Sequence, residues 1–142
     1  MQIRPSNSED FEQVLTLLRQ LWPDKVLDAN FSREVFNRAL AANNQVSFCA
    51  IVDEAIVGFG SLTFKNVFWP GGPIANIDEL VVDEQHRRRG VGGRLLAEII
   101  EHARRHGCRR IELDSAHHRA AAHQFYGKLG FENRACLFSK TL

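Results

Sequence analysis

Apolar residues in the first third of the chain recur at the spacing of an amphipathic helix. A short strand is predicted over 2–5, and the polar residues 6–10 supply hydroxyls and carboxylates that cap a helix. The helix that follows carries its apolar residues three or four positions apart, namely Phe11, Val14, Leu15, Leu18 and Leu21. Pro23 predicts the end of this helix, and a second helix is expected over 32–42.

From Val46 onward the helical spacing gives way to runs of β-branched and aromatic residues. The runs 46–52 and 56–64 are separated by a tight turn and predict an antiparallel hairpin. A third strand, over 75–82, leads directly into HRRRGVGGRLL at 86–96. A long helix is then expected over 91–106, because its apolar stripe has helical spacing and a glycine follows.

The last part of the chain predicts further strands around a short helix. A strand is expected within 108–114, a helix over 120–129, and a last strand or two within the tail 131–142. The element order predicts an α/β protein with a mixed sheet and helices on both faces. The length is that of one ordinary globular domain, so we expect a single domain over 1–142.

Composition and charge restrict the cellular compartment and the classes of partner that we expect for the chain. The 18 lysines and arginines nearly balance the 17 aspartates and glutamates, so no global field favours nucleic acid or an anionic membrane. The polar N-terminus and the lack of any run of about 18 apolar residues predict an unexported protein without a membrane segment. Cys49, Cys108 and Cys136 fall in predicted strands and are expected to be small buried hydrophobes, as suits a reducing cytoplasm.

The stretch HRRRGVGGRLL predicts an anion site at a strand-to-helix turn. The first amides of a helix lack internal partners, and the helix dipole adds about half a positive charge there. Gly90, Gly92 and Gly93 let the main chain approach a pyrophosphate, and the arginines supply outer charge. A Walker loop would need Gly-Lys-Ser/Thr, and a dinucleotide fingerprint would need glycine where Leu95 stands. A simple glycine cap with solvated arginines is the alternative.

A second motif, RAAAHQFYGKLGF at 119–131, gives the first one a family context. The spacing Arg-x-x-Gly-x-Gly, filled by Arg87, Gly90 and Gly92, and the later Ala-x-x-Phe-Tyr-x-x-x-Gly-Phe together resemble the GNAT superfamily of acetyl-CoA-dependent N-acyltransferases. NIDELVV, AHQFYGKLGF and LFSKTL most resemble small bacterial aminoalkylphosphonate N-acetyltransferases. The resemblance implies the GNAT fold, with a central mixed, mostly antiparallel sheet.

The resemblance also implies acetyl-CoA as co-substrate and indicates its contacts. The arginine-glycine turn would hold the pyrophosphate, the strand end would pair with the pantetheine arm, and a backbone N–H near Leu80 would hold the oxyanion. Many members carry asparagine where Arg119 stands, so Arg119 is expected to reach a phosphate instead. The implied cofactor-binding residues are Leu80, Val81, Val82, Arg87, Arg88, Arg89, Gly90, Val91, Gly92, Gly93, Arg119 and Tyr126.

Acetyl transfer to an amine needs a base for the ammonium, whose pKa is about 10, and an acid for the departing thiolate. Asp78 and Glu79 lie on the strand before the turn, and adjacent strand residues face opposite sides, so only one should point into a given cleft. The resemblance favours Glu79 as the base over Asp78, and a surface salt bridge is the alternative role. Tyr126, the only tyrosine, matches the family's acid, and core packing is its alternative role.

The sequence therefore predicts an N-acetyltransferase that acetylates the primary amine of a small molecule, such as an aminoalkylphosphonate, directly in a ternary complex. Acetylation of a protein lysine or N-terminus, and an acyl-CoA sensor without turnover, are the alternatives. No metal is expected, because the histidines lack a third ligand at metal spacing. We expect a cytoplasmic homodimer without nucleic-acid or membrane partners.

Overall fold

Strands and helices follow the hydrophobic pattern of the sequence along most of the chain. The computed structural model describes residues 1–142, which divide into a first unit, Met1–Glu112, and a second unit, Leu113–Leu142. The elements in order are β1 (Gln2–Pro5), η1 (Ser8–Asp10), α1 (Phe11–Leu21), α2 (Ala29–Ala41), β2 (Gln45–Val52), β3 (Ala55–Val67), β4 (Gly72–Val82), η2 (Glu84–His86), α3 (Val91–Arg105), β5 (Ile111–Leu113) and α4 (Ala120–Lys128).

The sheet has the strand order β1-β2-β3-β4-β5, and each neighbouring pair from β1 to β4 is antiparallel. The chain that enters β5 runs in the same direction as β4. Arg109 donates its N–H to the Pro73 carbonyl (3.1 Å), and Ala75 donates to the Arg110 carbonyl (3.0 Å). The predicted mixed, mostly antiparallel sheet is therefore confirmed.

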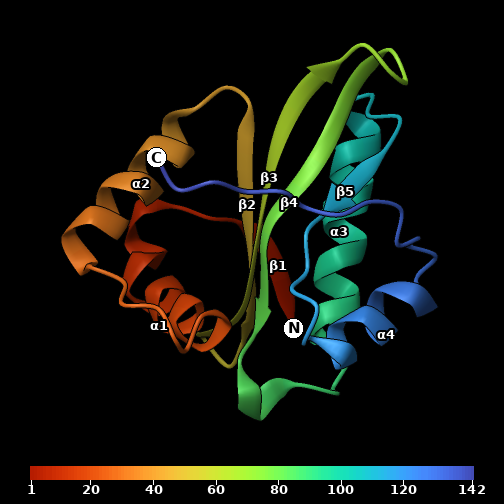
Figure 1. Cartoon of the computed structure of the whole chain (residues 1–142). Coiled ribbons are helices and arrows are strands. Elements are labelled where there is room, and N and C mark those ends of the chain that lie inside the picture. The colour runs from red at the N-terminus through yellow and green to blue at the C-terminus, as the bar shows by residue number, and fades with distance from the viewer. The chain divides into compact units, whose positions relative to one another are not determined.

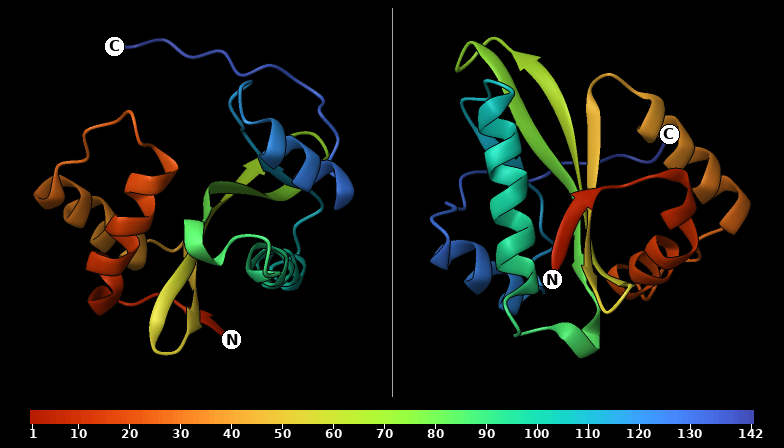
Figure 2. Two further views of the ribbon diagram at one scale, coloured as in Figure 1. Left: turned by 90° about the horizontal axis from the view of Figure 1, so that it is seen from below. Right: turned by 180° about the vertical axis from the view of Figure 1, so that it is seen from behind.

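Helices cover both faces of the sheet in the first unit, as predicted: α1 and α2 lie on one face and α3 lies on the other (Figures 1 and 2). The core under α1 and α2 consists of buried side chains from both helices and from three strands. These residues are Phe11, Val14, Leu15, Leu17, Phe36, Cys49, Ile56, Phe59 and Val81. The core under α3 includes Ala50, Val57 and Val91.

Two glycines on β3 leave room for the side chains of α3 to pack against the sheet. A Cβ atom on Gly58 would meet Ala50 at 3.2 Å and Val91 at 3.3 Å, and a Cβ atom on Gly60 would lie 2.5 Å from the Ile99 Cδ1 atom. A side chain at either position would force neighbouring side chains, including those of α3, to move, because a packed core has no room for extra atoms. The glycines therefore allow α3 to pack closely against β3.

The structure corrects two predictions made from sequence. The tail 131–142 forms no strand, and the side chains of Leu137 and Phe138 are 69% and 92% exposed. Alternating apolar residues favour a strand only where a neighbouring strand and a core accept them, and the tail has no place in the sheet. Of the cysteines only Cys49 is buried; Cys108 is partly buried, Cys136 is exposed, and neither lies in a strand.

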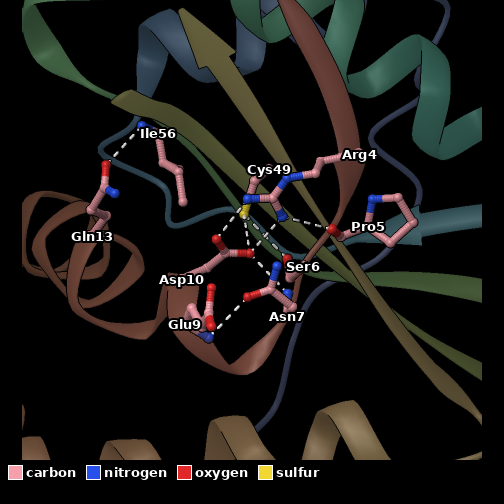
Figure 3. Close-up of polar contacts among 9 residues, drawn as sticks. All are labelled: Arg4, Pro5, Ser6, Asn7, Glu9, Asp10, Gln13, Cys49 and Ile56. Atoms are coloured by element: carbon pink, nitrogen blue, oxygen red, sulfur yellow. Dashed lines mark hydrogen bonds and ion pairs between the residues drawn. The ribbon is translucent and has the colours of Figure 1, made fainter. Parts of the chain in front are cut away.

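A nearly buried ion pair joins β1 to the start of α1 (Figure 3). Arg4 binds both carboxylate oxygens of Asp10, at 2.7 and 2.8 Å, and the Asn7 N–H donates to the same carboxylate at 2.8 Å. Arg4 lowers the pKa of Asp10 below its ordinary value, and burial raises the pKa of the neighbouring Cys49 thiol to about 11. The Asp10 charge is thus stabilised by a bidentate partner and a backbone donor.

We expect Asp10→Asn to lower the free energy of unfolding by about 2 kcal/mol at neutral pH, since Arg4 then loses its charged partner. Because folding lowers the Asp10 pKa, the charged carboxylate stabilises the fold fully above its pKa in the unfolded chain, near 3.8. This stabilisation is lost as the pH falls through the pKa of Asp10 in the folded protein. Urea unfolding at several pH values measures both effects. The control is Glu12→Gln, which removes the charged partner of Arg33 in an exposed ion pair. It should lower the free energy of unfolding by less than about 0.5 kcal/mol. Equal losses in the two variants would contradict this account.

Candidate active site

The connection from β4 to α3 gathers unpaired backbone amides at the start of the helix. Arg88 and Gly90 adopt left-handed conformations, with φ of 60° and 80°. The helix begins at Val91, and its first bond runs from the Arg94 N–H to the Gly90 carbonyl at 3.1 Å. The amides of 91–93 thus precede the first intrahelical bond, and no side chain caps them. This is the geometry of a backbone anion site at a helix N-terminus.

The arginines of the turn have different surroundings. Arg87, Arg88 and Arg89 are exposed, and the Arg87 Nε–H donates to the Val82 carbonyl at 3.1 Å, which folds its side chain back toward β4. Arg94 instead donates to the Met1 carbonyl at 3.4 Å. The three arginines before the helix are therefore the cations that adjoin the free amides, while Arg94 reaches the N-terminus of the chain.

The end of β4 can offer its backbone to a ligand only along one edge. Its three last residues, Leu80–Val82, pair with β3 through Gly60, Phe59 and Gly58 in that order. An extended ligand arm that pairs with this backbone must therefore use the edge of β4 that faces away from β3.

A bulge in β4 places both candidate carboxylates on one face of the sheet. Ser61 pairs with Glu79 and Leu62 pairs with Ile77, so Asp78 has no partner on β3. The Ser61 hydroxyl donates to the Glu79 carboxylate, and the Thr63 hydroxyl donates to Asp78 at 2.5 Å. Because Ser61 and Thr63 are two residues apart, they share a face of β3.

That shared face is the one opposite α3, because the Cβ direction of Gly60, on the other face, points at Ile99 of α3. The prediction that only one of Asp78 and Glu79 can point to a given side is therefore wrong. It assumed regular alternation along the strand, and the unpaired residue of the bulge breaks that alternation.

The environments of the two carboxylates differ. Glu79 is half-buried, and burial raises its pKa above the ordinary value. The Ser61 hydrogen bond opposes that rise, and the charge of Asp78 adds to it. Asp78 is exposed and also accepts a hydrogen bond from the Asn76 amide at 2.8 Å. Glu79 thus has the better properties for a general base, whose pKa works best near the operating pH.

Tyr126 and Arg119 belong to the second unit. Tyr126 lies on α4, with its ring centroid 5.4 Å from that of Phe125 and 5.6 Å from that of Phe131. Burial raises the pKa of the Tyr126 hydroxyl, and the positive charge of Arg119, which immediately precedes α4, opposes the rise. The phenol therefore carries its proton at neutral pH and has one available to donate.

The histidines of α3 pack against aromatic rings of the sheet. His106 stacks on Phe64 with 3.9 Å between ring centroids, and His102 meets Phe48 edge-on at 5.2 Å. Burial lowers the pKa of His102. No group of three or more histidine, cysteine, aspartate or glutamate side chains is placed to hold a metal ion.

Sequence reasoning missed the polar partners of the site. Ser61 and Thr63 interrupt an apolar strand at alternate positions, which is a signal that could have identified them as polar-face residues. Gln20 on α1 also contacts the β4–α3 connection, donating to Asp83 at 3.0 Å. Local pattern gives no indication of that contact, because the two residues are 63 positions apart.

Comparison with known proteins gives consistent results. The Acetyltransferase (GNAT) family model matches residues 11–131. An aminoalkylphosphonate N-acetyltransferase of Salmonella typhimurium is 30% identical over 141 residues, which cover 99% of this chain and 91% of that enzyme. A glucosamine 6-phosphate N-acetyltransferase of Trypanosoma brucei brucei is 36% identical over 85 residues, which cover 59% of this chain and 56% of that enzyme. The match therefore spans little more than half of the trypanosomal enzyme.

A solved structure of AAC(6′)-Iy, in complex with the bisubstrate analogue CoA-S-monomethyl-acetylneamine, is similar to the whole chain. Its TM-score is 0.85 at 25% identity, over 99% of this chain and 98% of that chain. No helix of the present chain is both long and apolar enough to cross a membrane.

The two glycines at the ends of the turn should respond in opposite ways to alanine. Gly90→Ala forces a left-handed alanine at φ 80° and should lower the free energy of unfolding by about 1 kcal/mol. Gly93 lies within α3, and an added Cβ there would have no neighbour from another part of the chain within 4 Å. Gly93→Ala should therefore raise the free energy of unfolding by about 0.5 kcal/mol. Urea unfolding of both variants measures the difference, and a shift of the same sign in both would contradict the assigned turn geometry.

Proposed function

Because this chain belongs to the GNAT family of acetyltransferases and is an acetyl-CoA-dependent N-acetyltransferase, we propose that it acetylates the primary amine of a small molecule by direct transfer in a ternary complex. The observation that carries this proposal is the half-buried Glu79, held by Ser61 on a bulged strand that leads into a turn of free amides. A base and an anion site on one strand–turn–helix segment suit an amine acceptor and a phosphorylated donor.

Acetyl-CoA is the co-substrate, and we propose contacts for each of its parts. The free amides of the turn donate hydrogen bonds to the pyrophosphate, the exposed arginines bind the outer phosphates, and the end of β4 pairs with the pantetheine arm through its free edge. Arg119 reaches a phosphate. The cofactor-binding residues proposed are Leu80, Val81, Val82, Arg87, Arg88, Arg89, Gly90, Val91, Gly92, Gly93, Arg119 and Tyr126.

In the proposed reaction Glu79 takes a proton from the acceptor ammonium, directly or through water. The free amine attacks the acetyl carbonyl, a C–N bond forms, and a backbone N–H near Leu80 stabilises the oxyanion. The C–S bond then breaks, and Tyr126 donates a proton to the departing thiolate. The proton lost by the new amide nitrogen restores the Tyr126 hydroxyl, and Glu79 releases its proton to solvent. The products are the amide, coenzyme A and one proton.

The acceptor proposed is a small amine such as an aminoalkylphosphonate. The names of the relatives support a small acceptor, because they include an aminoalkylphosphonate, an amino sugar phosphate and an analogue that carries acetylneamine. The carboxylates of Asp78 and Glu79 on one face favour a cationic amino group there. A protein lysine or N-terminus is the alternative acceptor.

We propose further that the two units form one GNAT domain, because the family match over 11–131 crosses their boundary. The free state of all three cysteines supports a reducing cytoplasm. The exposed apolar side chains of the tail support a homodimer in which a second copy covers them. Light scattering on the purified protein measures the assembly state.

The test of the proposal offers acetyl-CoA to the purified protein with a panel of amines and records free thiol release. The panel holds aminoalkylphosphonates, amino sugar phosphates, aminoglycosides and lysine-containing peptides. We expect the highest kcat/KM with a small amine. Preference for peptides would support a protein lysine or N-terminus as the acceptor. If no amine gives free thiol above background, the proposed catalysis is wrong and the acyl-CoA sensor is favoured.

The acid limb of the pH–rate profile should report the Glu79 pKa, which lies above its ordinary value of 4.5. Activity is lost as the pH falls through that pKa, because the base becomes protonated. Ser61→Ala removes a hydrogen bond that favours the charged carboxylate, so the limb should move to higher pH. Glu79→Gln should lower kcat/KM about 100-fold or more and abolish the limb.

The matched control for the pH profile is Thr63→Val, which removes the hydroxyl that contacts Asp78 and leaves Ser61 in place. We expect no shift of the limb in this variant. A shift with Thr63→Val and none with Ser61→Ala would reassign the base to Asp78.

Tyr126→Phe should lower kcat about 100-fold while the dissociation constant of acetyl-CoA stays unchanged, because the hydroxyl acts only as the thiolate leaves. Pre-steady-state thiol release and calorimetric titration separate the two quantities. Phe125→Leu removes a neighbouring ring but keeps the hydroxyl, and so controls for lost packing. A wild-type kcat in Tyr126→Phe would remove this residue from the role of acid.

A further inference from the structure

The connection between β4 and α3 is fixed in place by a side chain from another helix. Its first residues, 83–86, are followed at once by the arginines and amides of the anion turn. Glu84 and Gln85 are exposed, so no apolar packing of their side chains holds this part of the chain. Polar contacts must therefore determine where the turn begins.

Gln20, in the last turn of α1, makes two of these contacts with one side-chain amide. Its Nε2 donates to the Asp83 Oδ1 atom at 3.0 Å, and its Oε1 accepts from the Glu84 N–H at 3.0 Å. Both hydrogen-bonding groups of the amide are thus used on adjacent residues of the connection. Such a pair fixes position and orientation together, which one bond alone does not.

Asp83 passes this restraint on toward the anion turn. Its second carboxylate oxygen accepts from the Gln85 N–H at 3.2 Å and lies 2.7 Å from the His86 Nδ1 atom. Its own N–H donates to the Val57 carbonyl of β3 at 2.8 Å. The hydrogen bond from Gln20 is the main cause that lowers the Asp83 pKa, so the carboxylate is charged when it makes these contacts.

The Gln20 contact also joins the two faces of the sheet. Its helix, α1, lies on one face and α3 lies on the other (Figure 2). The glycines of β3 set how close α3 lies to the sheet, but they leave the path of the chain between β4 and α3 undetermined. Gln20 adds a side-chain restraint at the end of β4, next to the bond from the Asp83 N–H to the Val57 carbonyl.

We propose that Gln20 is a positioning residue for coenzyme A: through Asp83 and Glu84 it holds the 83–86 segment, and thereby the amides and arginines of 87–93, in the arrangement that binds the pyrophosphate. The proposal rests on the proposed coenzyme role of that turn. Gln20 itself touches no substrate, so its loss should weaken binding of the coenzyme and leave the chemical step intact.

The test compares Gln20→Leu with Gln13→Leu. Gln13 is the same residue type on the same helix, and its Oε1 also accepts a backbone N–H, from Ile56 at 2.8 Å, at the start of β3 (Figure 3). We expect Gln20→Leu to raise the dissociation constant of coenzyme A and the KM for acetyl-CoA about tenfold, with kcat at saturation unchanged. Gln13→Leu should leave both constants at the wild-type value.

A pair of substitutions that exchanges the amide and the carboxylate between positions 20 and 83 keeps the test independent of stability. Gln20→Glu alone places two carboxylates together and should weaken coenzyme binding at least as much as Gln20→Leu. Adding Asp83→Asn restores a donor–acceptor pair in the opposite sense and should recover most of the affinity.

Three results would overturn the proposal: wild-type coenzyme affinity in Gln20→Leu, an equal loss of affinity in Gln13→Leu, or a fall in kcat at constant KM. Calorimetric titration of the wild-type protein with coenzyme A separates this failure from that of the proposed function. Binding to the wild-type protein with no effect of Gln20→Leu overturns the positioning role alone. No binding to the wild-type protein overturns the coenzyme role of the turn as well.

Discussion

The close approach of α3 to β3 is the constraint on which the anion turn depends. Gly58 and Gly60 contribute no side chain to the layer between strand and helix, and a Cβ at Gly60 would lie 2.5 Å from the Ile99 Cδ1 atom. With the helix fixed against the sheet, its free N-terminal amides lie a short connection away from the end of β4. The packed core thus sets the direction of these amides, and the Gln20 contacts restrain the chain that leads into them.

The strand that leads into this turn separates opposite charges along its length. Its bulge carries two carboxylates on the face opposite α3, and its end passes into exposed arginines and unpaired N–H groups. Under the proposed function, a cationic amine and an anionic coenzyme are attracted to different parts of the same segment. Electrostatic attraction can therefore guide each substrate toward its own part of the site.

Sequence pattern predicted most of the fold, because its elements bury one continuous apolar face each. The anion turn was also predictable, since glycine spacing and a following helix are local signals. Three features were not. The bulge at Asp78 depends on pairing with β3, the Gln20–Asp83 contact joins residues 63 positions apart, and the exposure of the tail depends on where strands are available. Each is decided by tertiary neighbours and not by local sequence.

The bulge has a consequence for which sequences this strand can tolerate. On the α3 side of β4, Ile77 pairs with Leu62, and Leu80 lies 3.2 Å from the Cβ position of Gly60. In a regular strand, residues 77 and 80 would face opposite sides, and one of two adjacent acidic residues would enter the apolar layer, at a cost of several kcal/mol. The unpaired residue Asp78 shifts the alternation of side chains along β4 by one residue. An uncharged core and a doubly acidic surface can then coexist within four consecutive residues.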